Sequence, residues 1–172
     1  MVRPACGRLT TANEVDRMNW ILIKAVIKAR KAGLLHLKRC EGPLRFECLA
    51  SKCAKCCLLL GSPVVTEKEA GKIDRQYILK NKYGMFIKSE GCTCCLLKEN
   101  LCSIYPNRPR GCREYPWYNI DGQLYYDSGC PGITTEGGNN PDVKIIQPFE
   151  NFFPKTSKPI LWLIKKICIK KY

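Results

Sequence analysis

The sequence predicts a small α+β protein, made mainly of helices and irregular loops around a cysteine/metal centre, with one short β-hairpin. Three observations predict this class. Thirteen cysteines occur in 172 residues, and most of them lie in the middle of the chain. Two capping-box patterns precede apolar residues at helical spacing. One pair of apolar runs is joined by Asp121-Gly122, which is typical of a two-residue hairpin turn.

The length fits one domain that buries its own core without disulfides. We therefore expect residues 1–172 to form a single domain. Within it, the cysteine-cluster core covers about 46–133. An N-terminal amphipathic helix covers about 12–33, and a C-terminal tail covers 145–172.

The first helix is predicted from its start, its face and its end. Thr11-Ala12-Asn13-Glu14 is a capping box, and Gly33 is a plausible stop. Apolar residues recur between them at helical spacing: Val15, Met18, Leu22, Ala25, Val26 and Ala29. We interpret this segment as a helix packed on the domain, in preference to a helix on a membrane surface.

A second capping box, Thr66 to Glu69, predicts a helix that continues to about Lys80, although Gly71 weakens it. The residues expected to face inward are Ala70, Ile73, Tyr77 and Ile78. Residues 85–87 are apolar and predict a short strand that leads to the second run of cysteines.

The last third of the chain contains the hairpin and a terminal helix. Arg108-Pro109 predicts the start of a short helix that runs through Glu114. Residues 117–120 and 123–126 are the two expected strands of the hairpin. Cys130-Pro131-Gly132 predicts a tight turn. Residues 160–172 alternate apolar residues with Lys and predict a short helix, docked on the domain in preference to an interfacial anchor.

Composition limits the function classes. The formal net charge is +14, which favours an anionic partner such as nucleic acid, a membrane surface or an acidic protein. We consider nucleic acid unlikely as the partner, because no recognition module is visible. Eight cysteines bound as thiolates would each subtract one charge and lower the total to +6. A single histidine, His36, excludes most histidine-dependent catalysis.

Neither a secretory signal nor a stretch long enough for a transmembrane segment is evident in the sequence. Together with the odd number of cysteines, this predicts a cytoplasmic protein. In a reducing compartment, clustered cysteines bind metal more often than they form disulfides.

The cysteine spacing itself indicates a metal centre. Cys53-x-x-Cys56 has the knuckle spacing in which two sulfurs bind one metal. Adjacent cysteines, such as Cys56-Cys57 and Cys94-Cys95, suit a disulfide scaffold poorly. We expect Cys57 to point away from Cys56, toward a second metal or a polynuclear cluster. Radical S-adenosylmethionine enzymes carry a Cys-x3-Cys-x2-Cys loop. The cysteine spacing of this chain differs from that pattern by one residue.

Several separate motifs resemble one known family. They are Phe46-x-Cys48, Cys53-x-x-Cys56-Cys57, Cys94-x-x-Leu97, Cys102-Ser103-Ile104-Tyr105, Arg108-Pro109-x-x-Cys112-Arg113-x-Tyr115-Pro116 and Cys130-Pro131-Gly132. In this order they are similar to the YkgJ-type CxxCxxCC cysteine-cluster family, described as a zinc- or iron-chelating domain. The resemblance covers about half of the chain and implies metal or cluster binding.

The resemblance also implies a set of metal ligands. These are Cys48, Cys53, Cys56, Cys57, Cys94, Cys102, Cys112 and Cys130. Cys95 stands where the family usually has proline, which leaves open whether Cys94 or Cys95 is the ligand. The remaining cysteines are expected to be free thiols or small buried residues: Cys6, Cys40, Cys92, Cys95 and Cys168.

Residues beside Cys112 are candidates for supporting roles. Arg108, Arg110 and Arg113 could offset thiolate charge and donate to sulfur, or they could be surface charges or pair with Glu114. An apolar wall around the site is expected from Tyr105, Tyr115 and Trp117. Asp74, Asp121 and Asp127 are ordinary candidates for a general base, and none is singled out.

The sequence thus predicts a metal-binding cysteine-cluster protein that holds an iron–sulfur, polynuclear iron or zinc centre, with iron slightly favoured. One alternative is a zinc-stabilised adaptor that binds an acidic protein partner. Another is a protein-modifying enzyme, by analogy with the related clusters of the flagellin lysine methylases. The sequence leaves the metal, any reaction and the oligomeric state open.

Overall fold

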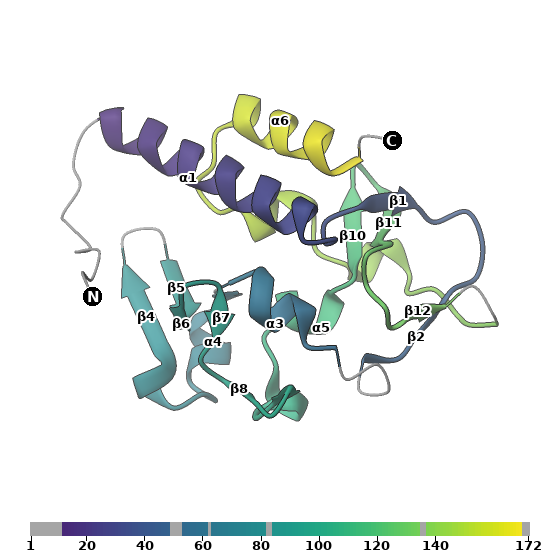
Figure 1. The fold of residues 1–172 in the computed structure, drawn as a ribbon, viewed down its shortest axis with the longest axis horizontal. Coiled ribbons are helices and arrows are strands. Elements are labelled where there is room, and N and C mark those ends of the chain that lie inside the picture. The colour runs from purple at the N-terminus through teal and green to yellow at the C-terminus, as the bar shows by residue number, and fades with distance from the viewer. Residues whose placement is uncertain (1–11, 49–52, 62, 82–83, 135–136, 170–172) are drawn as a thin grey trace.

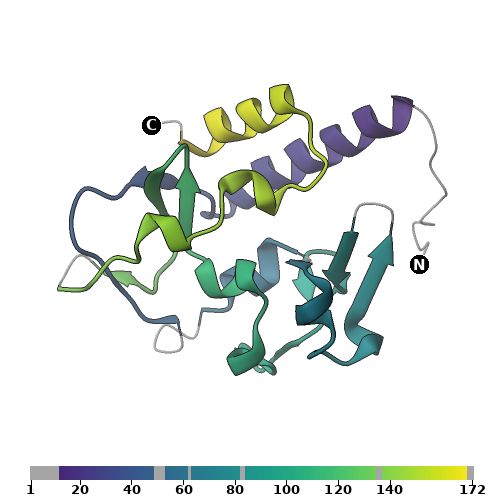
Figure 2. The ribbon, with the colours of Figure 1, turned by 180° about the vertical axis from the view of Figure 1, so that it is seen from behind.

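The computed structural model describes residues 12–48, 53–61, 63–81, 84–134 and 137–169, with side chains from residue 20 onward. Its α-helices are α1 (Ala12–Lys31), α3 (Lys55–Leu59), α4 (Glu67–Ala70), α5 (Arg110–Glu114) and α6 (Lys158–Ile169). Helices α1 and α6 lie side by side along one edge of the molecule in both views (Figures 1 and 2). Helices α3 and α5 lie between two small sheets (Figure 1).

Twelve short strands pair into small antiparallel sheets over the described residues. One three-stranded sheet has the order β1 (Leu37–Arg39), β11 (Gln123–Asp127), β10 (Trp117–Ile120). The other has the order β3 (Val64–Val65), β5 (Gly84–Ile87), β4 (Ile78–Asn81). The two-stranded pairs are β2 (Arg45–Phe46) with β12 (Ile133–Thr134), β6 (Ser89–Glu90) with β7 (Thr93–Cys94), and β8 (Leu97–Lys98) with β9 (Leu101–Cys102).

The mixed α+β class is therefore confirmed, but the expectation of mainly helices with one hairpin is wrong. The pairs β4–β5, β6–β7 and β8–β9 are hairpins as well. Most of these strands have two to four residues. Such strands are too short to show the apolar alternation by which a strand is recognised in sequence.

The predicted hairpin is confirmed in register and in turn chemistry. Trp117 pairs with Tyr126, and Ile120 pairs with Gln123. Asp121 and Gly122 both have positive φ, at 52° and 77°. A two-residue turn with both φ values positive matches the right-handed twist of the strands, which favours Asp-Gly at these two positions.

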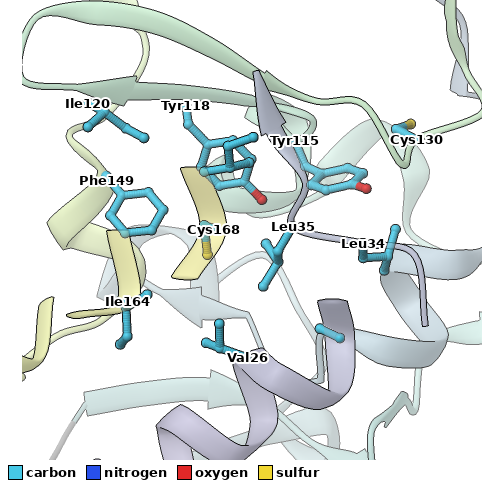
Figure 3. Close-up of a cluster of buried hydrophobic side chains, with 12 residues drawn as sticks. Val26, Leu34, Leu35, Tyr115, Tyr118, Ile120, Cys130, Phe149, Ile164 and Cys168 are labelled. Atoms are coloured by element: carbon cyan, nitrogen blue, oxygen red, sulfur yellow. The ribbon is translucent and has the colours of Figure 1, made fainter. Parts of the chain in front are cut away.

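Helix α1 ends where the sequence predicts. Gly33, with φ of 85°, follows its last turn, and a left-handed residue there closes the helix end. The proposed cap at Thr11 lies outside the described residues. The buried face of α1 joins the main core, in which Val26 packs with Ile164 and Cys168 of α6 (Figure 3). This core also includes Leu34, Leu35, Tyr115, Tyr118, Ile120, Cys130 and Phe149.

The second predicted helix is correct at its start and wrong in its extent. The Thr66 and Glu69 capping box is present, but α4 stops at Ala70, with Gly71 as its C-cap. The Asp74 side chain then accepts a hydrogen bond from the Gln76 backbone and caps a 3-10 turn. From Ile78 onward the chain forms β4, because pairing with β5 satisfies its backbone groups.

The other local predictions agree with the structure. Residues 85–87 lie in β5, α5 follows Pro109, and α6 covers the start of the expected terminal helix. Cys130 begins a turn in which the Ile133 backbone N–H donates to the Cys130 carbonyl. Within the described residues, no helix is both long and apolar enough to span a membrane.

Candidate metal centre

One cavity of ≈ 510 Å³ brings the predicted ligands together. Cysteines from six separate segments of the chain line it: Cys48, Cys53, Cys56, Cys57, Cys94, Cys102, Cys112 and Cys130. These are the eight residues selected from the sequence. The other described cysteines, namely Cys40, Cys92, Cys95 and Cys168, do not line the cavity. Of the adjacent pair left open by the sequence, Cys94 therefore faces the cavity.

The short elements carry these thiols to the cavity from several directions. Cys94 and Cys102 close the strands β7 and β9, whereas Cys112 lies inside α5. Cys48 follows β2, and Cys130 lies in the turn after β11. Segments that are distant in sequence are thus held around one space, and a shared ligand there would couple binding to folding.

The adjacent Cys56 and Cys57 of the first cysteine run have side chains that point in different directions. Ala54 adopts a left-handed conformation, with φ of 49°, and α3 begins directly after it. Cys56 and Cys57 therefore lie in the first turn of a helix, where successive side chains diverge by about 100°. Both line the same cavity, and their Sγ atoms are 4.0 Å apart. Cys56 packs against the main core and Cys57 against the separate cluster around Ile73, so the two side chains diverge as expected, although both line the one cavity.

Burial disfavours the thiolate form of several of these cysteines in the metal-free protein. It raises the pKa of Cys112 to about 12 and that of Cys130 to about 11. The pKa of Cys56 is also raised, first by the hydrogen bond to the Cys57 thiol and then by burial. A metal ion would replace these protons, since thiolate is the form that binds metal.

Arg108 is the arginine that faces the sulfurs. Burial raises the pKa of Cys48 and of Cys102, and the positive charge of Arg108 opposes that rise at both. The Arg108 side chain also hydrogen-bonds Cys48. Its guanidinium stacks over the Tyr105 ring at 3.6 Å, and Nε donates to the Tyr105 carbonyl at 3.1 Å. These contacts hold a positive charge against the cavity wall.

The two neighbouring arginines serve the scaffold instead. Arg110 pairs with Glu114 and donates to the Ile145 carbonyl. Arg113 lies 3.9 Å from Glu69 and donates to the Arg108 carbonyl. Of the three arginines proposed from the sequence, Arg108 is therefore the one placed to interact with the sulfurs, and Arg113 is not. Proximity to Cys112 in the sequence does not fix the direction of a side chain.

The apolar wall is partly the predicted one. Tyr105 and Tyr115 line the cavity, whereas Trp117 packs with Leu44 and Ile146 in a separate cluster. Residues that the sequence did not single out complete the wall, among them Leu22 and Val26 of α1, Leu59 of α3, Tyr118 and Phe152. The helical spacing of Leu22 and Val26 marked a buried face, but spacing alone could not say that a cavity lies beneath it.

The donor set suits a soft metal centre of more than one ion. Eight thiols are twice the number that one tetrahedral ion takes, and thiolate sulfur selects zinc, iron or iron–sulfur clusters. Among the described residues, however, no group of three His, Cys, Asp or Glu side chains is close enough to hold a metal ion. The described thiols are therefore not arranged as a closed metal site, so binding requires them to move closer together.

A thiol-lined cavity of this kind defines the class of metal-chelating cysteine-cluster domains. Residues 47–131, which include all eight cavity cysteines, match the model of the CxxCxxCC family, described as "Putative zinc- or iron-chelating domain". The chain carries a domain of this family and is a metal-binding cysteine-cluster protein. No curated protein and no solved structure matches the chain.

Proposed function

We propose that the eight cavity cysteines bind one shared polynuclear centre, iron–sulfur or iron in preference to zinc. The observation that supports this is that all eight thiols line one cavity, whereas two closed zinc sites would each need four thiols of their own. The Cys56 and Cys57 sulfurs, 4.0 Å apart, are close enough to bind the same centre. When bound, such a centre supplies redox or Lewis-acid chemistry.

The chain's own residues would hold and shield this centre. Arg108 offsets part of the negative charge that the thiolates acquire. The apolar side chains of α1 and α3 exclude water from one side. Glu69 is the only Asp, Glu or His that lines the described part of the cavity. It is held by Thr66 and by the Arg110 backbone N–H at 2.6 Å. Because these bonds employ its carboxylate, Glu69 serves the scaffold and not acid–base catalysis.

The test is to purify the protein without oxygen and to measure its metal content, visible absorption and electron paramagnetic resonance. We expect more than one iron per chain, with absorption in the visible range. A colourless protein with two zinc ions per chain would contradict the cluster and support the zinc-stabilised alternative.

The ligand assignment predicts different outcomes for cysteines that line the cavity and for a cysteine that does not. Cys112→Ser and Cys56→Ser should each lower the bound metal per chain and destabilise the fold, because ligation and folding are coupled. Cys168 of α6 is buried in the core shared with α1 and does not line the cavity, so Cys168→Ser should keep full metal content. Elemental analysis of the three variants decides this. Equal metal loss in all three would refute the assignment.

Arg108→Ala should weaken metal retention without removing a ligand. We expect the purified protein to lose metal to a competing chelator about tenfold faster, since groups that hydrogen-bond to ligands typically contribute 10- to 100-fold in affinity. The matched control is Arg75→Ala, an exposed arginine in the 3-10 turn after α4. A loss rate unchanged by Arg108→Ala would show that its charge does not support the centre.

The zinc-stabilised adaptor remains the second candidate, because the net charge of +14 favours an acidic partner. In that case the protein would bind acidic polypeptides in its zinc form, and binding would fall as salt is raised. A protein-modifying activity would instead require turnover of a side-chain substrate by the metal-loaded protein. Absence of such turnover together with salt-sensitive binding would favour the adaptor.

A further inference from the structure

The outer faces of α1 and α6 expose large apolar side chains away from the cavity. Trp20 is 63% exposed and Ile21 is 55% exposed on α1, while Trp162 is 61% exposed on α6. Ile27 and Leu163 are also exposed on the same two helices. Large apolar side chains exposed on neighbouring helices indicate an interaction surface for a protein, a membrane or another ligand.

The two helices form one unit. Val26 of α1 shares a core with Ile164 and Cys168 of α6 (Figure 3). Ala29 of α1 belongs to the same core. The buried Arg30 side chain donates to the Cys168 carbonyl at 2.7 Å, which joins the ends of the two helices. Both views place this pair along one edge of the molecule (Figures 1 and 2). A flat partner could therefore contact both helices.

The charges around these apolar residues are basic. Residues 20–31 and 158–169 contain no Asp or Glu, and the acidic residues of α1, Glu14 and Asp16, precede the first stretch. The exposed lysines on the two helices are Lys24, Lys31, Lys158 and Lys166, together with Lys28, whose ammonium lies 4.0 Å from the Cys92 sulfur. Acidic groups reach α6 only at Lys165, whose ammonium lies 2.8 Å from Asp121 and 2.6 Å from Glu150, within the described residues.

Tryptophan interleaved with lysine is the composition of helices that lie in a membrane interface. The indole ring prefers the headgroup level, and lysine neutralises anionic lipids at about 1 kcal/mol per charge. The Lys166 ammonium lies 5.2 Å from the centre of the Trp162 ring, so charge and aromatic surface stand together on α6. A nucleic acid or an acidic peptide would use the lysines but would give no reason for the exposed aliphatic residues Ile21, Ile27 and Leu163.

We propose that the outer faces of α1 and α6 dock the protein on the surface of a bilayer that contains anionic phospholipid. Trp20, Ile21 and Trp162 enter the headgroup region, and the exposed lysines contact lipid phosphate. This places the thiol-lined cavity, beneath α1, close to a membrane surface. The proposal does not depend on which metal the cavity holds.

The test uses the full chain with two kinds of vesicles, phosphatidylcholine alone and phosphatidylcholine mixed with phosphatidylserine. We expect sedimentation with the mixed vesicles only, and a blue shift of tryptophan emission on binding. Trp117 is buried, so the shift would come from Trp20 and Trp162. Raising the salt concentration should weaken binding. Sedimentation with both kinds of vesicles alike, or with neither, would overturn the proposal.

Variants locate the contact. Trp20→Ala and Trp162→Ala should each lower vesicle partitioning by about tenfold, because each removes a large apolar surface. Lys24→Glu should lower it by about ten- to thirtyfold, since it changes two charges. The controls are Ile145→Ala and Lys98→Glu, which alter equally exposed residues outside the two helices.

Three outcomes would assign the surface to another occupant or to none. Equal partitioning of all variants and controls would show that the outer faces of α1 and α6 are not the contact. Self-association that Trp20→Ala abolishes, without vesicle binding, would make a second copy of the chain the occupant. If the protein bound an oligonucleotide and not vesicles, and Lys24→Glu weakened that binding, nucleic acid would be the occupant. Each result overturns the lipid proposal.

Discussion

Gly129→Ala is expected to destabilise the protein by more than about 4 kcal/mol, a size reached only by a few mechanisms, overpacking of fixed atoms among them. A Cβ at Gly129 would lie 1.7 Å from the Gly33 carbonyl oxygen and 2.8 Å from its carbonyl carbon. Both are backbone atoms, so no side-chain rotation can relieve the overlap. The turn after α1 would have to separate from the turn that carries Cys130.

The matched control for this change is Gly42→Ala, where an added Cβ meets no atom within 4 Å. It should change the free energy of unfolding by less than about 1 kcal/mol, as is usual away from special sites. Denaturant unfolding of the metal-free forms measures both variants without the contribution of bound metal. Equal stability of the two variants would mean that the close approach of these turns is not required by the fold.

The resemblance to the cysteine-cluster family implied which cysteines belong together, but the sequence did not indicate their geometry. All eight cysteines that the resemblance implied line one cavity. The choice between Cys94 and Cys95 could not be made, because adjacent residues at the end of a strand point to opposite faces and the sequence does not say which face is inward. Likewise, Ala54 gives no sign in sequence of the left-handed turn that brings Cys56 and Cys57 to the same space.

The parts of the fold that escaped prediction depend on distant pairing. The sequence marks the start of α4 through Thr66 and Glu69, since a capping box is a local signal. The end of the helix depends on β4 pairing with β5, which competes with helix for the residues after Gly71. Strands of two residues are defined only by their partners, so β2, β7 and β9 could not be recognised singly.

The role of Asp127 also could not be predicted from the sequence. The sequence offered it as one of several ordinary candidates for a general base. The structure buries it completely, at 0% exposure, and surrounds its carboxylate with donors. It accepts from the backbone N–H groups of Leu35 at 2.6 Å, His36 at 3.0 Å and Gly129 at 3.0 Å, and from the Tyr115 hydroxyl at 3.2 Å. A carboxylate bonded in this way holds separate chain segments together, which is a structural role.

Asp127→Ala should therefore destabilise the protein by about 4 kcal/mol or more, since each buried donor left without an acceptor costs about 1–3 kcal/mol. The bonds of Asp127 join three segments: the turn after α1, Tyr115 directly after α5, and the turn that carries Cys130. Because α5 contains Cys112, one carboxylate sets the relative positions of two cavity cysteines.

A comparison with a second aspartate separates this role from ordinary turn capping. The exposed Asp142 caps a short 3-10 turn through the Lys144 backbone N–H at 2.9 Å, so Asp142→Ala should cost no more than about 1 kcal/mol. Hydrogen exchange gives a local readout: in Asp127→Ala the amides of Leu35, His36 and Gly129 should lose protection, and metal content should fall with them. If Asp127→Ala kept both its amide protection and its metal, the two cysteine-bearing segments would have to be positioned by the core packing around Tyr115 and Cys130 alone.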